Sequence, residues 1–243
     1  MNLALLSAED LREGGKARLT GRRRDHLVSV LRAGEGDSLA VGLENGLMGT
    51  GTVTRLTDSL AELAVTLDQP PPAPLPLTLV LAMPRPKMFR RVLQTVAALG
   101  VKDIWLINSY KVEKSFWQTP WLQEAQLHEN LTLGLEQAKD TLIPTVHLRK
   151  RFKPFVEDEL PALLQDRPGI VAHPGTHEPC PIHINRPATL CIGPEGGFIP
   201  YEVDKLVEAG CEAVHLGSRI LRVETAVPVL VSRLYDGCLA TFS

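Results

Sequence analysis

The sequence lacks the features that identify several classes of protein. Its four cysteines lie far apart and form no C-x-x-C pair, so we expect no zinc, no other metal and no dithiol motif, and we expect Cys191 and Cys211 to be buried free thiols. No stretch approaches about 18 uninterrupted apolar residues, and the N-terminus carries no basic segment followed by a long apolar one. A soluble cytoplasmic protein without a membrane partner is therefore the expectation. At 243 residues it is long enough to bury a core without disulfides.

Common catalytic motifs are missing as well. There is no G-x-x-x-x-G-K-[ST] and no G-x-G-x-x-G after the first predicted strand of the second half, which argues against the usual nucleotide folds. The G-x-S-x-G motif of serine hydrolases and the H-E-x-x-H motif of zincins are also absent. The chemistry must therefore come from a less common kind of site.

Charge is unevenly distributed along the chain. The formal net charge is −2, which by itself argues against a nucleic-acid partner. Basic residues nevertheless concentrate in segments 16–32 and 85–114, whereas acidic residues concentrate in 124–159 and 195–212. If the two basic segments share a face, that face can bind phosphates. A scatter of solvated charges is the alternative.

Two domains of different character are predicted. Residues 1–69 contain short strand patterns at 38–41, 51–56 and 61–67 and one short helix at 25–32, which is typical of a small β-barrel. Residues 70–76 are rich in proline and predict a stiff linker. Residues 77–243 alternate strands (77–83, 104–107, 146–148, 169–172, 190–192) with helices (88–99, 121–142, 155–164). That alternation predicts an α/β domain with a mostly parallel sheet.

The stretch 190–230 holds the most informative pattern. An apolar run ends in the glycine-rich segment 193–197, and a second apolar run ends in Leu216 and Gly217, followed by a loop at 218–222. Each loop follows the carboxyl end of a predicted strand, where open α/β sheets bind ligands. Glycines allow close approach of the backbone, so the pair of loops suits a neutral or cationic small molecule held by main-chain groups. Thr225 is predicted to cap the last helix.

These residues closely resemble the RsmE family of SPOUT-class, S-adenosylmethionine-dependent methyltransferases, which methylate N3 of a uridine in 16S ribosomal RNA. The resemblance is carried by GPEGG at 193–197 and LGSRILRVET at 216–225, and more weakly by His26, by Lys87 with Met88, and by His173 with Pro174. It covers nearly the whole chain. It implies that residues 1–69 form an RNA-binding PUA-like barrel and that residues 77–243 form the methyltransferase domain.

The resemblance also implies a deep trefoil knot at the C-terminus and an obligate homodimer acting on ribosomal RNA or the small ribosomal particle. S-adenosylmethionine would lie bent between the two loops. The cofactor-binding positions that it implies are His173, Ile192, Gly193, Glu195, Gly196, Gly197, Leu216, Gly217, Ile220, Leu221 and Arg222.

Methylation at N3 requires loss of the N3 proton, so a cation that stabilises the resulting anion is expected. Arg222 is the first candidate, Glu224 can orient an arginine or accept the proton, and Lys139 is a third catalytic candidate. For Arg222 and Glu224, a structural ion pair is the alternative. The predicted RNA-binding residues are Arg22, Arg23, Arg24, Arg32, Lys87, Arg90, Lys111 and Arg219.

Several positions depart from the family pattern. The arginines that follow the family's Glu-Gln pair are replaced by Asp140 and Leu142, and further changes occur at Thr95, Ala98 and Lys111. The cofactor side is thus kept while the substrate side differs. Two alternatives to uridine N3 methylation remain open: a SPOUT enzyme that modifies another RNA nucleotide, and an RNA-binding assembly factor without turnover.

Overall fold

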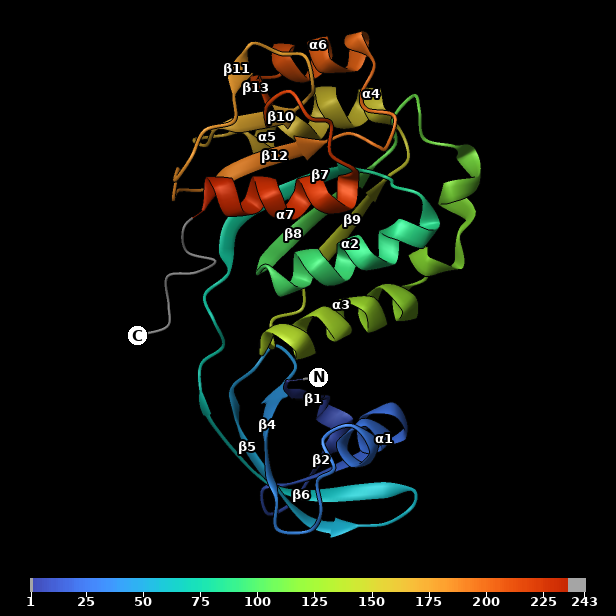
Figure 1. The fold of residues 1–243 in the computed structure, drawn as a ribbon, viewed down its shortest axis with the longest axis vertical. Coiled ribbons are helices and arrows are strands. Elements are labelled where there is room, and N and C mark those ends of the chain that lie inside the picture. Colours follow the sequence, from blue (N-terminus) through green and yellow to red (C-terminus); the bar gives the residue numbers. More distant parts are fainter. Residues whose placement is uncertain (1, 236–243) are drawn as a thin grey trace. The chain divides into compact units, whose positions relative to one another are not determined.

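The computed structural model describes residues 2–235, which form two compact units (Figure 1). Unit 1 contains residues 2–73 and 131–143, and unit 2 contains residues 74–130 and 144–235. The chain passes from one unit to the other within the proline-rich segment 70–76, although Leu75 and Pro76 already belong to a strand of unit 2. The sequence assigned residues 131–143 to the second domain, whereas in the structure they group with unit 1.

Unit 1 is built on a mixed six-stranded sheet in the order β1-β4-β5-β6-β3-β2. β1 and β4 are parallel, and the other neighbours are antiparallel. The elements are β1 (Ala4–Leu6), η1 (Ala8–Asp10), β2 (Leu11–Arg12), β3 (Lys16–Thr20), α1 (Gly21–Ser29), β4 (Ser38–Leu43), β5 (Met48–Leu56) and β6 (Leu60–Gln69). The strands that the sequence predicted are present, and the predicted helix begins at Gly21 rather than Asp25.

The core of unit 1 follows from strand alternation. Residues of β3 are alternately exposed and buried, which turns Ala17 and Leu19 inward. They lie opposite Leu63 and Ala61 of β6, and the same cluster includes Leu27 of α1. A small apolar core is thereby closed between the sheet and its helix.

Backbone hydrogen bonds explain why residues 131–143 belong to unit 1. The amides of Asn2 and Leu3 donate to the carbonyl of Glu136 at 2.8 and 3.0 Å, and the amide of Asn45 donates to the carbonyl of Thr141 at 2.8 Å. The side chain of Glu136 is almost fully buried and lies 2.9 Å from the guanidinium of Arg22. Such long-range pairing has no signature in local sequence.

A buried ion pair joins η1 to α1. The guanidinium of Arg23 donates to both carboxylate oxygens of Asp10 at 2.6 and 2.7 Å and to the carbonyl of Leu5 at 2.7 Å. Burial raises the pKa of Asp10, but the hydrogen bonds from Arg23 and from the backbone and hydroxyl of Ser7 outweigh it and hold the pKa below its usual value. Arg23 is therefore engaged in holding unit 1 together.

Unit 2 is an α/β unit with a seven-stranded, fully parallel sheet in the order β11-β13-β10-β12-β7-β8-β9. Its strands are β7 (Leu75–Ala82), β8 (Val101–Ile107), β9 (Thr145–Arg149), β10 (Gly169–Ala172), β11 (Glu178–Pro179), β12 (Ala188–Ile192) and β13 (Cys211–His215). The α/β class and the parallel sheet predicted from the alternating pattern are confirmed.

Helices cover this sheet and connect its strands. They are α2 (Pro86–Ala98), η2 (Lys114–Gln118), η3 (Pro120–Leu122), α4 (Phe152–Pro154), the π-helical turn η4 (Phe155–Glu159), α5 (Leu160–Leu163), α6 (Pro200–Glu208) and α7 (Val223–Leu234). The remaining helix, α3 (Glu124–Ala138), begins in unit 2 and ends in unit 1. α2 and α7 pack side by side in front of the sheet, and α6 packs on β13 and β10 (Figure 1).

The strand order brings three chain segments to one edge of the sheet. β10 lies between β12 and β13, and Val171 is in register with Cys191 on one side and Ala213 on the other. Because all three strands are parallel, their carboxyl ends lie at the same edge. The segments that begin at His173, Gly193 and Leu216 therefore start beside one another.

Two local predictions are corrected or completed by the structure. α7 begins at Val223 with Arg222 as its N-cap, so Thr225 does not cap it, and Pro228 lies inside the helix without an amide proton for the carbonyl of Glu224.

Cys191 and Cys211 are buried free thiols, as predicted. Cys238 lies outside the described residues. Within residues 2–235, no helix is long and apolar enough to span a membrane.

We predict that Asp10→Asn lowers the free energy of unfolding at pH 7 by about 2 kcal/mol, because it removes a charged acceptor from Arg23. The folded state lowers the pKa of Asp10, so the stability from this carboxylate is present above its unfolded pKa and is lost as pH falls through its folded pKa. Urea denaturation should therefore show a large difference between wild type and variant at neutral pH and a small one in acid.

Glu62→Gln is the matched control. It breaks the ion pair of Glu62 with Arg18 at 3.0 Å on the surface of the same unit, and it should change stability by less than about 0.5 kcal/mol. Equal stability of Asp10→Asn and wild type at pH 7 would contradict the role given to the buried pair.

Candidate functional site

The first loop of the site follows β12 and depends on glycine at its first position. A Cβ on Gly193 would lie 2.8 Å from the backbone nitrogen of Phe198 and 3.2 Å from the carbonyl carbon of Gly197. The loop closes through a hydrogen bond of 2.7 Å from the amide of Gly197 to the carbonyl of Pro194, with Gly197 at a φ of 69°. Backbone thus packs on backbone here, which leaves no room for a side chain at position 193.

The second loop follows β13 and is shaped by a local side-chain contact. The amide of Gly217 donates to Nδ1 of His215 at 2.9 Å, and Gly217 adopts a φ of 106°, a conformation that favours glycine. Residues 218–220 are exposed, and Ile220 is 80% exposed although it is a large apolar residue. An apolar side chain held in solvent beside a cavity is suited to covering a ligand.

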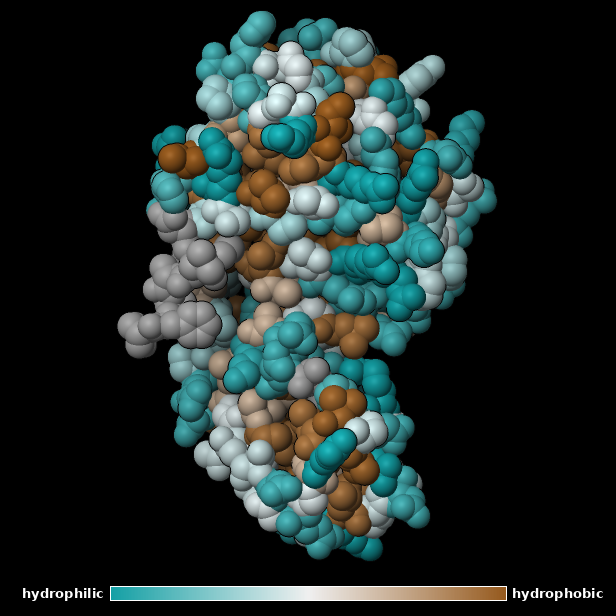
Figure 2. All heavy atoms as spheres, viewed as in Figure 1, coloured by the Kyte–Doolittle hydropathy of each residue, from teal (hydrophilic) through white to brown (hydrophobic). Residues whose placement is uncertain are grey.

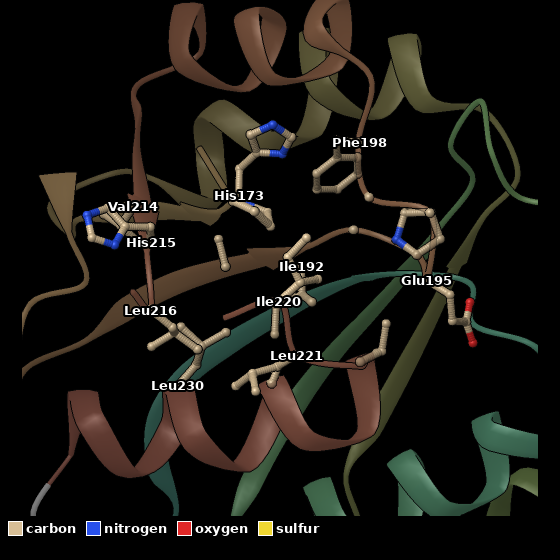
Figure 3. Close-up of a pocket in the computed structure, with 18 of the residues that line it drawn as sticks. His173, Ile192, Glu195, Phe198, Val214, His215, Leu216, Ile220, Leu221 and Leu230 are labelled. Atoms are coloured by element: carbon tan, nitrogen blue, oxygen red, sulfur yellow. The ribbon is translucent and has the colours of Figure 1, made fainter. Parts of the chain in front are cut away.

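Both loops open onto one cavity of about 460 Å³, a size typical of small-molecule sites (Figure 3). Figure 3 shows Ile192 at the end of β12 and Ile220 in the second loop facing this space, with Leu230 of α7 on one side and His173 on the other. Figure 2 shows hydrophobic surface between α6 and α7, on the face where these elements meet the cavity. The larger apolar residues that line it are Ile192, Phe198, Val214, Leu216, Ile220, Leu221, Val223 and Leu230.

The ionisable side chains that line this cavity are those of Lys111, His173, Glu195, His215 and Arg219. Burial lowers the pKa of His173, and the nearby charge of Lys111 lowers it further, so the imidazole is held neutral at neutral pH. Its Nδ1 is buried and has no hydrogen-bond partner within residues 2–235. Lys111 donates to the carbonyl of Gly196 at 2.6 Å, and Oε1 of Glu195 accepts from the amide of Arg85 at 2.9 Å. These contacts brace the first loop from outside.

The structure brings most of the predicted cofactor residues together. All of the predicted cofactor positions except Arg222 line the cavity, and so do Lys111 and Arg219 from the predicted RNA-binding set. Arg222 is exposed at the start of α7, between two lining residues, and its side chain makes no ion pair within the described part of the chain. Glu224 is half-buried in the first turn of α7. Lys139 belongs to unit 1, where it lines a hollow with Ser38, Leu39 and Ala40.

The predicted RNA-binding arginines of α1 are largely engaged within unit 1. Besides the ion pairs of Arg22 and Arg23, Arg24 donates to the carbonyl of Thr57 at 3.0 and 2.6 Å. Arg32 and Lys87 are exposed. The guanidinium of Arg90 lies 4.2 Å from the ring centre of Trp121, and its Nε donates to Asn130.

Sequence reasoning missed several lining residues. Phe198 and His215 lie directly beside the two predicted loops, and Leu230 lies one turn beyond the part of α7 that the motif covers. The ends of strands β10 and β13 could have indicated Val214, but no local pattern marks Leu230 as facing a cavity. Within residues 2–235, no group of three or more His, Cys, Asp or Glu side chains is arranged to hold a metal ion.

Comparison with known proteins identifies the family. Residues 71–235 match the RNA methyltransferase domain family. The chain belongs to this family. It is 27% identical to a ribosomal RNA small subunit methyltransferase E of Treponema pallidum over 93% of the chain and 87% of the relative, and 23% identical to one of Borreliella burgdorferi over 93% and 94%. The resemblance to the RsmE family that the sequence predicted is thus confirmed.

Solved structures show the same fold. A ribosomal RNA small subunit methyltransferase E of Neisseria gonorrhoeae, bound to S-adenosyl methionine, superposes with a TM-score of 0.74 at 24% identity and covers 96% of this chain and 95% of its own. A methyltransferase of Legionella pneumophila, in complex with the same cofactor, gives a TM-score of 0.73 at 20% identity over 95% of each chain.

We predict that Gly193→Ala destabilises unit 2 by about 1–3 kcal/mol, because the new methyl group meets backbone atoms that cannot move independently. Gly196→Ala is the matched comparison, since a Cβ there meets only the flexible Lys111 side chain at 2.8 Å. In urea denaturation, the free energy of unfolding of Gly193→Ala should be well below that of Gly196→Ala. A reversed order would show that the first loop is not tightly packed.

Proposed function

We propose that this protein transfers a methyl group from S-adenosylmethionine to N3 of a uridine in 16S ribosomal RNA. The observation that carries the proposal is the cavity between the two glycine turns at the carboxyl ends of β12 and β13. Its size and apolar walls fit a small cofactor, and the glycines leave main-chain groups accessible to it. Family membership supports methyl transfer to RNA, and the name of the Treponema relative supports the ribosomal small subunit as the substrate.

The fit of the cofactor rests on features of the chain itself. Gly193, with its close backbone packing, and the exposed Ile220 both line the cavity, one from the first loop and one from the second. The neutral His173, with its unpartnered Nδ1, offers a buried polar atom in the wall of the cavity. Bound S-adenosylmethionine supplies an electrophilic methyl group on sulfur, and the residues of the cavity hold that methyl group in line with the nucleophile.

Arg222 is the residue best suited to act on the substrate. N3 of uridine has a free electron pair only after its proton leaves, and the resulting anion requires a nearby cation. Arg222 follows the cavity residues Ile220 and Leu221 directly and carries no ion pair among the described residues. Glu224, two residues on in the first turn of α7, is available to orient this arginine or to accept the proton. Lys139 belongs to unit 1 and stays a prediction.

The proposal also covers the role of unit 1, the threading of the C-terminal segment and the oligomeric state. Unit 1 acts as an RNA-binding, PUA-like barrel, which its mixed sheet supports. The C-terminal segment is threaded as a trefoil knot; this is supported by the return of the chain from β13 at one side of the sheet to α7, which packs on α2. The active enzyme is a homodimer of cytoplasmic location.

Methylation mapping tests the proposed function. Purified protein, labelled S-adenosylmethionine and either a 16S ribosomal RNA transcript or small-subunit particles should yield one N3-methyluridine. A methyl group on a different nucleotide would favour the alternative that the departures at Ala98, Asp140 and Leu142 suggest. If no RNA is labelled although the protein still binds RNA, the protein is an assembly factor and not an enzyme.

We predict that Arg222→Ala lowers kcat by about 100- to 1000-fold, as expected when one preorganised charge facing the transition state is lost. The dissociation constant for S-adenosylmethionine, measured by calorimetry, should stay unchanged because Arg222 does not line the cavity. Arg186→Ala is the matched control, since Arg186 is exposed and precedes β12 at the opposite edge of the sheet. Single-turnover rates equal to wild type in the Arg222 variant would remove this residue from the mechanism.

A further inference from the structure

We propose that an exposed surface at the carboxyl ends of β8 and β9 binds the single-stranded RNA that flanks the target nucleotide. We call it the β8–β9 surface and define it by Tyr110, Lys114, Lys150 and Arg151. The inference rests on the proposed function, because it names the path by which RNA reaches the cavity. Three of these residues lie outside the motifs that relate the chain to its family, and Tyr110 stands beside Lys111, where the sequence departs from the family pattern.

The residues come from two neighbouring segments. β8 and β9 are parallel neighbours, with Ile107 in register with Arg149. Beyond this pair, the amide of Asn108 donates to the carbonyl of Arg149 at 2.9 Å, and the indole of Trp117 donates to Oδ1 of Asn108 at 2.8 Å. In Figure 1 the green segment after β8 rises beside α4, which follows β9. Trp117 belongs to η2, so this contact ties the short helix that contains Lys114 to Asn108, which is itself bonded to Arg149, the residue before Lys150.

Not every charge in this region is available to a ligand. The guanidinium of Arg149 is held by both carboxylate oxygens of Glu159 at 2.6 and 2.7 Å, and Lys153 lies 3.7 Å from Glu157. Lys114, Lys150 and Arg151, in contrast, are exposed and form no ion pair with any other residue of 2–235. Cations without a protein partner are those that release counterions when they neutralise phosphates.

An exposed aromatic residue lies in the segment that follows β8, four residues before Lys114. Tyr110 is 78% exposed, although tyrosine is usually at least half-buried in a domain of this size. Its backbone is fixed, because its amide donates at 2.7 Å to Oε1 of the buried Glu202, which also binds the amide of Ile199 at the start of α6. A rigidly mounted, exposed ring is suited to stacking on a base.

Two contacts connect the β8–β9 surface to the cavity. Lys111, directly after Tyr110, lines the cavity and donates to the carbonyl of Gly196. Phe152, directly after Arg151, has its ring centre 6.2 Å from that of Phe198, which also lines the cavity. RNA bound across Tyr110 and Arg151 therefore meets the wall of the cavity itself. An acidic protein segment would use the same cations but has no need for an exposed ring, so the geometry points to RNA.

Fluorescence anisotropy with a labelled single-stranded RNA of about 20 nucleotides tests this surface, with affinity measured between about 50 and 200 mM KCl. Lys150→Ala and Arg151→Ala should each reduce the slope of log affinity against log salt by about 0.7, the value of one lost phosphate contact. Tyr110→Ala should weaken binding about tenfold with the slope unchanged, and Tyr110→Phe should bind as wild type does.

Arg186→Ala controls for the loss of one positive charge, and it should leave both affinity and slope unchanged relative to wild type. Slopes and affinities for Lys150→Ala and Arg151→Ala equal to those of Arg186→Ala would overturn the inference. So would a labelled polyglutamate peptide that binds wild type more tightly than the RNA and loses affinity in the same variants, because it would assign the surface to an acidic protein.

Calorimetry with S-adenosylmethionine separates this inference from the proposed function. All variants of the β8–β9 surface should bind the cofactor as wild type does. If wild type binds no cofactor, the proposed function fails, while the salt slopes still decide whether the surface binds RNA. If cofactor binding and methylation are intact but the salt slopes do not change, the surface is wrong and the proposed function stands.

Discussion

The site depends on the close approach of backbone to backbone at Gly193. The first loop packs so tightly on the amide of Phe198 that no side chain fits at its start. The register of β10 with both β12 and β13 fixes the spacing of the two turns. The sheet therefore fixes where the cavity lies, and the two loops form its walls.

Which basic residues can bind phosphate depends on their contacts within the protein, not on the net charge of the chain. The arginines of α1 hold unit 1 together through Asp10, Glu136 and the carbonyl of Thr57, so most of that basic run is not free to bind phosphate. In unit 2, Lys111 braces the first loop and helps to keep His173 neutral. Among residues 2–235, exposed cations without an ion pair include Arg219 and Arg222 at the second loop and Lys114, Lys150 and Arg151 beyond β8 and β9.

Much of the fold follows from the sequence, since the alternating pattern of 77–234 predicts the parallel sheet and the proline-rich segment predicts a change of unit. The glycine turns were predicted because loops after parallel strands converge, whereas Leu230 enters the cavity only through the packing of α7, which no local pattern encodes. The attachment of residues 131–143 to unit 1 was also hidden, because it depends on hydrogen bonds between residues more than a hundred positions apart, such as Asn2 and Glu136. The sequence predicts Thr225 as the cap of the last helix because threonine is common at that position. In the structure the N-cap is Arg222, and α7 already begins at Val223.

The central claim is that both glycine turns enclose one cofactor. Hydrogen exchange measured with and without S-adenosylmethionine tests it most directly, because bound ligand slows exchange at amides that it contacts or covers. We expect slower exchange in both segments, 192–198 and 216–221, at the same cofactor concentration. Protection of one segment alone, or of neither, would contradict the account.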